Sequence, residues 1–388
     1  MKLNLAFSTC LTAVILAQVA ASSAPRDDKS PEAFSNFVNN VVYRPGPGHY
    51  HLQTLYARTL QLKDGSHLLT WENYGPEPPL QSFPIFKSKD GGATWSNFSK
   101  VEDQINGWGN RFQPHLYRLQ NDVGDYPAGT IILGGMSVRK LLEEAWLDVY
   151  TSSDEGETWK LASQVVHAPG PETTKNGDKA VWEPFFLEYK GQLVCYYSTQ
   201  EDKKHGQKLA HVTTADLKKW SDEANDVAYP TYKYRPGMTT VAHIKSTKKY
   251  VMTYELCDGP DGGCPSYFKV ANSPLEFDKS EGKKIVAKTG ENPGSAPYII
   301  WTPHPQMNDG SGLLLMSGAQ NDAIYINDDS AAADGWRRFN IKQDSAHSRG
   351  MEVVDVKGAR RLMLASGGHM VFENTNNWVS VGVIDIPF

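Results

Sequence analysis

An eight-residue motif that occurs twice constrains this chain more than any other feature. Ser88–Trp95 and Ser152–Trp159 both read Ser-x-Asp-x-Gly-x-Thr-Trp, and each copy follows a short apolar run. This composition suits a tight β-turn, because Asp accepts hydrogen bonds from backbone N–H groups of its own turn and Gly supplies a φ that other residues resist. The Trp then packs back between neighbouring strands. The motif therefore predicts a scaffold element and not a chemical site.

Weaker copies of the motif follow at a regular period. They are Thr214–Trp220, Asn272–Phe277, Asn327–Trp336 and Asn374–Trp378. Successive copies are roughly 45 to 65 residues apart, which is typical of β-propeller blades. Six positions along the chain therefore predict six blades.

Short β-rich runs bounded by turn residues lie between the motifs. The sixth unit, for example, is expected to use Met351–Val356, Arg361–Ala365 and Met370–Glu373 as strands. This repeated pattern of strands and turns predicts an all-β fold, a six-bladed β-propeller of four-stranded antiparallel blades over residues 40–388. Closing the blades into a ring protects their edges. Val138–Ala145 is compatible with a helical turn inserted in the second blade.

The N-terminus has the pattern of a secretory signal peptide. Lys2 precedes an apolar run from Leu3 to Ala21, and small residues there suit cleavage after residue 21 or as late as residue 24. No later stretch is long and apolar enough to span a bilayer. The formal charge of −5 and the lack of a basic stripe argue against a nucleic-acid partner. We expect a secreted, extracellular monomer that binds neither nucleic acid nor membrane.

Three cysteines remain after removal of the signal peptide. Cys257 and Cys264 bracket a Gly-rich loop that is flexible enough to close a disulfide in an oxidising compartment. Cys195 lies in an apolar run and is expected to be a buried free thiol. Because no Cys or His partners stand at ligand spacing, we expect no metal and no cofactor.

The turn motif also indicates where chemistry should occur. It joins the third strand of a blade to the outermost strand, so it marks one face of the propeller. Propeller substrates usually bind on the opposite face, around the central channel. That face is built from the starts of the innermost strands and the ends of the second strands.

Glu183 and Glu255 are the candidate catalytic residues at those places. Glu183 is enclosed by aromatic residues and proline, and desolvation there raises the pKa of a carboxyl group. A carboxylic acid still protonated near neutral pH can protonate a glycosidic oxygen. Glu255 ends an apolar strand beside the expected disulfide loop. Alternatively, each Glu is an exposed loop charge or pairs with Arg349 or Arg235.

Other residues at the same two places are candidate substrate contacts, because aromatic faces stack on sugar rings and polar groups bind hydroxyls. They are Trp182, Tyr254, Arg111, His115, Glu72, Arg349 and His369. Glu72 is the next candidate if Glu255 is not the nucleophile.

From about Val41 to Phe388 the chain resembles the family-93 glycoside hydrolases, secreted exo-α-1,5-L-arabinanases with a six-bladed sialidase-like propeller. The resemblance rests on the two turn motifs, which are Asp-boxes, on Trp-Glu-Pro at Glu183, and on Tyr-Glu-Leu-Cys-Asp-Gly at Glu255. It implies that Glu183 is the general acid/base and Glu255 the nucleophile. It also implies that the enzyme cleaves linear arabinan from the non-reducing end, releasing arabinobiose with retention of the anomeric configuration.

Two other functions stay open at this point. A sialidase has the same fold but needs three arginines around a carboxylate, and Arg111, Arg235 and Arg349 are the candidates for that triad. A non-catalytic glycan-binding propeller keeps the aromatic rim without needing an acid and a nucleophile close together.

Overall fold

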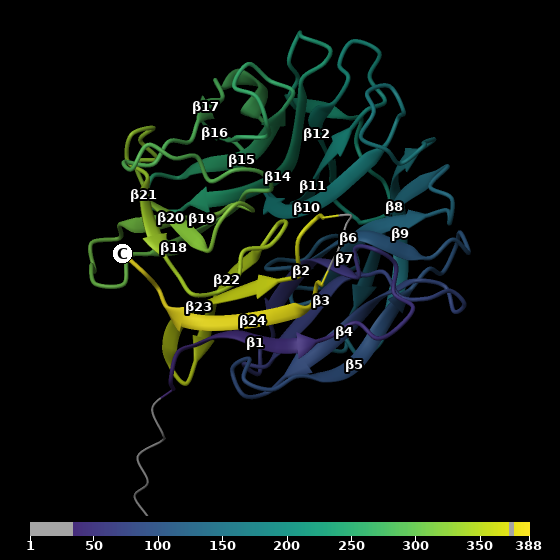
Figure 1. Ribbon diagram of the computed structural model, residues 1–388, viewed down its shortest axis with the longest axis horizontal. Helices are drawn as coiled ribbons and strands as arrows, with labels where there is room; N and C mark the ends of the chain where they lie inside the picture. Colours follow the sequence, from purple (N-terminus) through teal and green to yellow (C-terminus); the bar gives the residue numbers. More distant parts are fainter. Residues whose placement is uncertain (1–33, 372–375) are drawn as a thin grey trace, which may run out of the picture. The chain divides into compact units, whose positions relative to one another are not determined.

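The computed structural model describes residues 34–371 and 376–388, and nearly all regular structure there is β-strand. Six four-stranded antiparallel sheets form a six-bladed β-propeller, which confirms the predicted fold (Figure 1). A short 3₁₀ turn at Phe277–Lys279 is the one helical element in these residues. In the same part of the chain, no helix is long and apolar enough to cross a membrane.

Each blade takes its strands from the centre outward. Blade 1 is β2 (Thr54–Gln61), β3 (His67–Asn73), β4 (Ser82–Ser88) and β5 (Ser96–Glu102). Blade 2 is β6 (Asn110–Arg118), β7 (Ile131–Val138), β8 (Ala145–Ser152) and β9 (Lys160–Ala168). Blade 3 is β10 (Val181–Tyr189), β11 (Gln192–Thr199), β12 (Lys208–Thr214) and β13 (Ala224–Val227).

The remaining blades follow the same order except the last. Blade 4 is β14 (Arg235–Ile244), β15 (Lys249–Cys257), β16 (Ser266–Ala271) and β17 (Lys283–Lys284). Blade 5 is β18 (Tyr298–Pro303), β19 (Gly312–Ser317), β20 (Ala323–Asp328) and β21 (Arg337–Asn340). Blade 6 is β22 (Gly350–Val356), β23 (Ala359–Ser366), β24 (Val379–Asp385) and, from the N-terminal end, β1 (Phe37–Tyr43).

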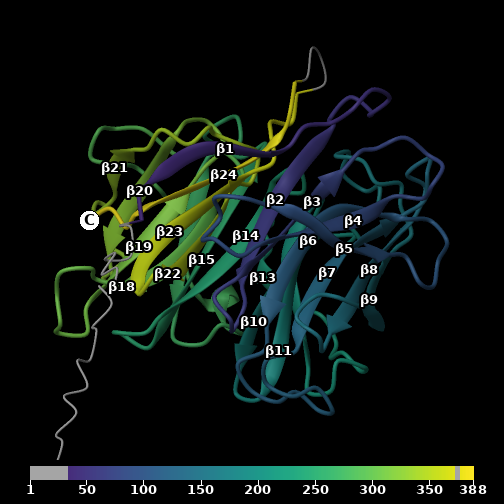
Figure 2. The same ribbon diagram turned by 90° about the horizontal axis from the view of Figure 1, so that it is seen from below.

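The sixth blade corrects the predicted strand assignment. β1 pairs with β24 as the outermost strand, so the two ends of the propeller are joined within one sheet (Figure 2). The third strand is β24, so the predicted connection at Asn374–Trp378 is wrong: its described part, 376–378, leads into β24 and not from the third strand to the outermost one. Of the predicted strand Met370–Glu373, residues 370 and 371 are not in a strand, and 372 and 373 lie outside the described residues. The error arose because a strand supplied from the far end of the chain leaves no local signal.

The two complete turn motifs have the same hydrogen bonds. In the second, Thr158 N–H donates to Asp154 Oδ1, and Gly156 N–H donates to Ser152 Oγ, both at 2.9 Å. In the first, Thr94 N–H and Gly92 N–H donate to Asp90 and Ser88 at 2.9 Å. Both motifs join the third strand to the outermost one, as predicted, and their only role visible here is structural. Val138–Ala145 is not helical; it contains the β7–β8 turn.

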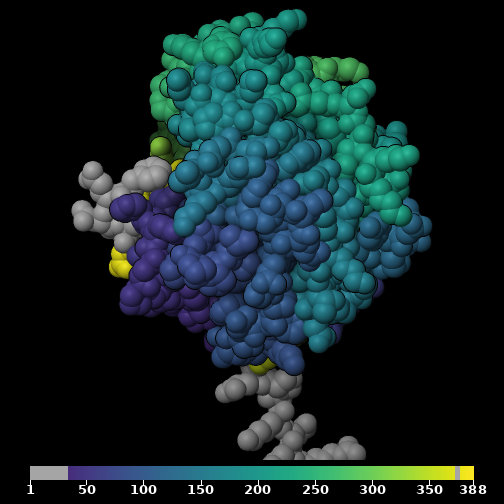
Figure 3. All heavy atoms as spheres, turned by 90° about the vertical axis from the view of Figure 1, so that its right-hand side faces the viewer, coloured from purple at the N-terminus to yellow at the C-terminus, as the bar shows by residue number. Residues whose placement is uncertain are grey.

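Neighbouring blades pack through interlocking aromatic side chains. Gly134 and Gly135, in the middle of β7, stand where any Cβ would overlap Phe186 of blade 3 and Phe83 of blade 1, respectively. Both rings are fully buried. The missing side chains therefore let blade 2 approach its two neighbours closely. In the space-filling view the blue and teal segments lie against one another (Figure 3).

This packing predicts a specific coupling between two blades. Gly135→Ala is expected to lower the free energy of unfolding by about 1–3 kcal/mol, because the added methyl group overpacks against Phe83. Phe83→Leu should lower the free energy of unfolding less in the Gly135→Ala variant than in the wild type, because the smaller side chain relieves the overpacking. Urea unfolding of the four variants of this cycle measures the coupling. Additive losses would show that the two positions do not clash.

Candidate active site

A left-handed residue stands at the start of every innermost strand. Their φ angles lie between 52° and 68°, and none of them is glycine. They are Tyr56, Gln113, Glu183, Met238, Ala296 and Ser348, one for each blade. Such a backbone conformation is costly for residues with a side chain and persists only where the surroundings enforce it. The sixfold recurrence therefore points to a function of this ring in building the channel face.

Four of the left-handed residues donate their N–H to a side chain of the preceding blade. The bonds run from Gln113 N to Glu72 Oε1 (2.8 Å), from Glu183 N to Gln113 Oε1 (3.3 Å), from Met238 N to Glu183 Oε2 (2.5 Å) and from Ala296 N to Glu255 Oε2 (2.8 Å). Three of the four acceptor side chains are glutamates. The ring of backbone donors thus fixes a row of carboxyl groups around the channel.

Glu183 lies on β10 and keeps only 9% of its surface exposed. Its Oε2 accepts hydrogen bonds from Met238 N–H at 2.5 Å and from the Ser198 hydroxyl at 2.6 Å. Burial raises the pKa of this carboxyl, while the two hydrogen bonds and the charges of Arg235 and Arg58 oppose the rise. Glu183 is therefore held firmly in a place that favours its protonated form.

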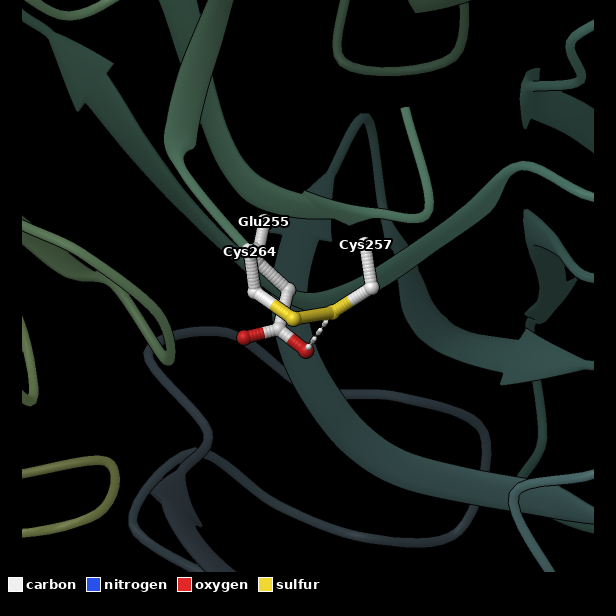
Figure 4. A group of neighbouring side chains, drawn as sticks. All are labelled: Glu255, Cys257 and Cys264. Carbon is white, nitrogen blue, oxygen red and sulfur yellow. Dashed lines mark hydrogen bonds between the residues drawn. A yellow bond between two sulfur atoms is a disulfide. The ribbon is translucent and has the colours of Figure 1, made fainter. Parts of the chain in front are cut away.

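Glu255 lies near the end of β15, where it is partly buried. Burial, and after it the charge of Glu183, raises the pKa of Glu255 to about 7. The predicted Cys257–Cys264 disulfide is present, and Cys257 Sγ lies 3.5 Å from Glu255 Oε1 (Figure 4). A disulfide sulfur carries no hydrogen, so this is a packing contact and not a hydrogen bond.

The same three residues bring a carboxylate oxygen and two sulfur atoms within 4.8 Å of one another. Metal ions bind cysteine as thiolate. Because both cysteines are oxidised to the disulfide, this group does not fit a metal site. Cys195 is free and buried, as expected.

Gly237 separates the two carboxyl groups. A Cβ at this position would lie 3.4 Å from Glu255 Oε1 and 3.7 Å from Glu183 Oε2. These two oxygens therefore lie within about 7 Å of each other, a limit that includes the 5–5.5 Å typical of retaining glycosidases and the lower end of the inverting range. The added Cβ would meet Gln207 Nε2 first, at 3.2 Å, so the space over Gly237, called the gap below, is shared by this amide and the two carboxyl groups.

Arg58 is a central residue that the sequence interpretation missed. It is 3% exposed, and its guanidinium donates to Ser348 O at 2.7 Å and to Ser348 Oγ at 2.6 Å. It also lies over the ring of Tyr56, 4.0 Å from the centroid. Burial raises the pKa values of Glu72 and Glu183, and the positive charge of Arg58 opposes this rise. The register shift between β2 and β3 beside it cannot be read from the sequence.

Two predicted substrate contacts lie away from the gap. Tyr254 is fully buried in the core, and its hydroxyl is 2.8 Å from that of Tyr229. Successive residues of a strand point to opposite faces, so Tyr254 points away from the side of Glu255. Arg349 is also fully buried and donates to backbone carbonyls, including that of Ala323 at 2.5 Å. Neither side chain is available to a substrate in this structure.

The other predicted contacts are divided between core and rim. Trp182 precedes Glu183 on β10 and is 9% exposed. The ring of His115 is tilted against that of Phe185 with centroids 4.5 Å apart, and burial lowers the His115 pKa to about 3. Both side chains are therefore largely enclosed by protein.

Arg111 lies at the start of β6, and His369 lies on the connection after β23. Arg111 forms an ion pair with Glu77 at 2.8 Å and donates to Val138 O at 2.8 Å, so its guanidinium braces two loops. His369 is exposed, and its N–H donates to Asn377 Oδ1 at 2.8 Å. Of this pair, His369 has the more accessible side chain.

Comparison with solved structures decides the family. The chain is similar to a GH93 α-L-arabinofuranosidase of Fusarium graminearum that was solved with arabinobiose. The two structures superpose with a TM-score of 0.86 and 39% sequence identity, over 90% of this chain and 98% of the other. A Penicillium chrysogenum α-L-arabinanase, also solved with arabinobiose, gives 0.86 and 36% over 91% of this chain and 99% of the other. The chain belongs to glycoside hydrolase family 93.

Other comparisons add little to this assignment. No family model and no curated protein sequence matches the chain. The NanB sialidase of Streptococcus pneumoniae superposes with a TM-score of 0.55 at 11% identity, over 90% of this chain and 71% of the other. That likeness shows a shared fold alone. The family-93 assignment thus rests on structures at 36–39% identity.

Burial of Glu255 in this family-93 chain predicts a pH-dependent stability. Because its pKa is raised from 4.5 to about 7, the folded state favours the protonated carboxyl, and its contribution is lost as the pH rises through about 7. Glu255→Gln should therefore raise the free energy of unfolding at pH 8 by about 1–3 kcal/mol, with little gain at pH 4.

Urea unfolding at the two pH values tests this expectation. Glu157→Gln, at an exposed position of a turn motif, is the matched control and should be neutral at both. An equal gain at pH 4 and pH 8 would mean that the ionisation of Glu255 is not the cause.

Proposed function

We propose that this family-93 protein is a retaining exo-α-1,5-L-arabinanase. It cleaves linear arabinan from the non-reducing end and releases arabinobiose. The observation that carries the proposal is the pair of carboxyl groups, Glu183 and Glu255, that lie on the two sides of the gap over Gly237. The substrate is inferred from the two relatives that were solved with arabinobiose.

In the proposed mechanism Glu183 is the general acid/base and Glu255 the nucleophile. Ionised Glu255 attacks the anomeric carbon while protonated Glu183 gives its proton to the departing oxygen. A water molecule, deprotonated by Glu183, then attacks the same carbon and releases Glu255. Two displacements at one carbon retain its configuration.

In the proposed mechanism the two carboxyl groups share one proton, and its assignment to Glu183 rests on the Trp-Glu-Pro segment that resembles the family. Repulsion between two close carboxylates favours a state with one shared proton. Backbone donation from Ala296 stabilises the ionised form of Glu255. Activity should therefore fall at low pH as Glu255 becomes protonated, and at high pH as Glu183 loses its proton.

The structure gives less support to the alternatives. A sialidase triad would need Arg111, Arg235 and Arg349 around one carboxylate, yet Arg111 is paired with Glu77 and Arg349 is buried among carbonyl groups. A purely glycan-binding propeller would not need two carboxyl groups with raised pKa values at one gap. Secretion is part of the proposal and rests on the signal-like pattern of residues 1–21.

Product analysis tests the proposed function. The protein is incubated with debranched arabinan and, separately, with a sialoside, and the products are identified by chromatography. Arabinobiose from arabinan alone is expected. Sialic acid would support the sialidase function instead, and binding without any product would support a glycan-binding protein.

Variants of the two carboxyl groups test their roles. Glu255→Gln should abolish turnover of every substrate, because no nucleophile remains. Glu183→Gln should lower the rate of turnover of arabinan about 10²–10⁴-fold. It should lower the rate much less on an aryl arabinoside, because the leaving group of that substrate needs no protonation. Near-wild-type activity of Glu255→Gln on arabinan would contradict the assignment.

A further inference from the structure

Glu72 and Glu255 occupy equivalent positions in blades 1 and 4. Glu72 pairs with Leu55 and Glu255 pairs with Gly237, and in both blades the next residue of the innermost strand is left-handed. Each carboxyl group also accepts an N–H from the left-handed residue of the following blade. By geometry alone, Glu72 would therefore be a second nucleophile.

The surroundings of Glu72 exclude that role. It is only 2% exposed, and Leu55 stands opposite it where Glu255 has Gly237. Glu72 Oε1 accepts from Gln113 N–H at 2.8 Å, and Oε2 accepts from the Tyr74 hydroxyl at 2.7 Å. Both oxygens are thus bound within the protein, and Glu72 does not face the gap that Gly237 leaves open.

The hydrogen bonds of Glu72 lead to Glu183. Gln113, whose N–H is bound by Glu72, offers its own side-chain oxygen to Glu183 N–H at 3.3 Å. Both N–H donors belong to residues with left-handed backbones, with φ of 53° at Gln113 and 68° at Glu183. A buried N–H without an acceptor costs about 1–3 kcal/mol, so these two bonds favour the otherwise strained conformations.

We propose that Glu72 and Gln113 are positioning residues for Glu183. Their chain of hydrogen bonds fixes the backbone of Glu183 and so directs its carboxyl group at the gap. The inference deepens the proposed function, because it names two residues on which the acid/base depends. Neither residue touches the substrate.

The charge of Glu72 is a separate matter from its hydrogen bonds. The groups facing Glu72 are Arg58, Glu183 and the hydroxyls of Tyr56 and Tyr74, and Arg58 and Arg235 face Glu183. Burial and the charge of Glu183 raise the pKa of Glu72 to about 7, so the repulsion within the pair favours the proton on Glu72. Glu72→Gln, which is neutral at every pH, should therefore leave the pKa of Glu183 and the alkaline limb of the activity profile in place.

Kinetics on arabinan test the positioning role. Glu72→Leu and Gln113→Met remove an acceptor each while keeping bulk, and each should lower kcat roughly tenfold with KM little changed, because Glu183 is misplaced. Their effects should not add in the double variant, since both break one chain. Glu72→Gln keeps an acceptor for Gln113 N–H, so it should restore most of kcat with the pH profile of the wild type.

Asp148→Asn is the matched control. Asp148 is another buried carboxyl group, with a pKa raised to about 7 by burial, and it bonds with Asn106 and Gln164 of blade 2. Its replacement should leave kcat and the pH profile in place. Wild-type kcat in both Glu72→Leu and Gln113→Met, or a kcat of Glu72→Gln as low as that of Glu72→Leu, would overturn the proposal.

A measurement without substrate keeps this inference separate from the proposed function. The carboxyl ¹³C resonance of Glu183, in protein labelled at glutamate and assigned with Glu183→Gln, is titrated in the wild type, in Glu72→Leu and in Glu72→Gln. A changed pKa of Glu183 is expected in Glu72→Leu, because the displaced carboxyl group loses its geometry with Ser198 and Met238, and a wild-type pKa is expected in Glu72→Gln. A wild-type pKa in Glu72→Leu would contradict the positioning role. If the wild type does not cleave arabinan, the proposed function fails while this titration still judges Glu72.

Discussion

The bond from a left-handed backbone N–H to a side chain of the preceding blade is the interaction on which the candidate site depends. It recurs at Gln113, Glu183, Met238 and Ala296, and it holds Glu72, Glu183 and Glu255. A carboxylate is a strong acceptor, so each of the three bonds to a glutamate ties two blades together and orients a titratable group at once. The closed ring of blades supplies the rigidity that keeps these costly backbone conformations in place.

The same scaffold gives related carboxyl groups different properties. Glu255 faces a gap because its cross-strand partner is Gly237, whereas Glu72 is enclosed by Leu55 and Tyr74. The turn motifs on the opposite face contribute only to the ring that carries them. Position in the repeat thus sets where a carboxyl group lies, and its immediate neighbours determine what it can do.

Much of the fold could be predicted from the sequence, because turn chemistry is local. Asp154 and Gly156 satisfy their own turn, and the spacing of such turns counts the blades. The outer strand of blade 6 could not be found this way, since β1 and β24 come from opposite ends of the chain. Within the site, Glu183 and Glu255 were predicted from apolar surroundings at strand ends, and the structure brings the two carboxyl groups together beside Gly237. Arg58 and Gln113 were missed because bulges and left-handed φ angles leave no trace in residues other than glycine.

The most direct test of the proposed mechanism is to trap the covalent intermediate. A 2-fluoro-arabinofuranoside with an activated leaving group should form a slowly hydrolysed glycosyl-enzyme. Trypsin separates the three carboxyl groups into the peptides 64–87, 180–190 and 250–269, which contain Glu72, Glu183 and Glu255, respectively. Mass spectrometry should find the sugar on Glu255 in peptide 250–269. A sugar on Glu72 or Glu183 would contradict the account.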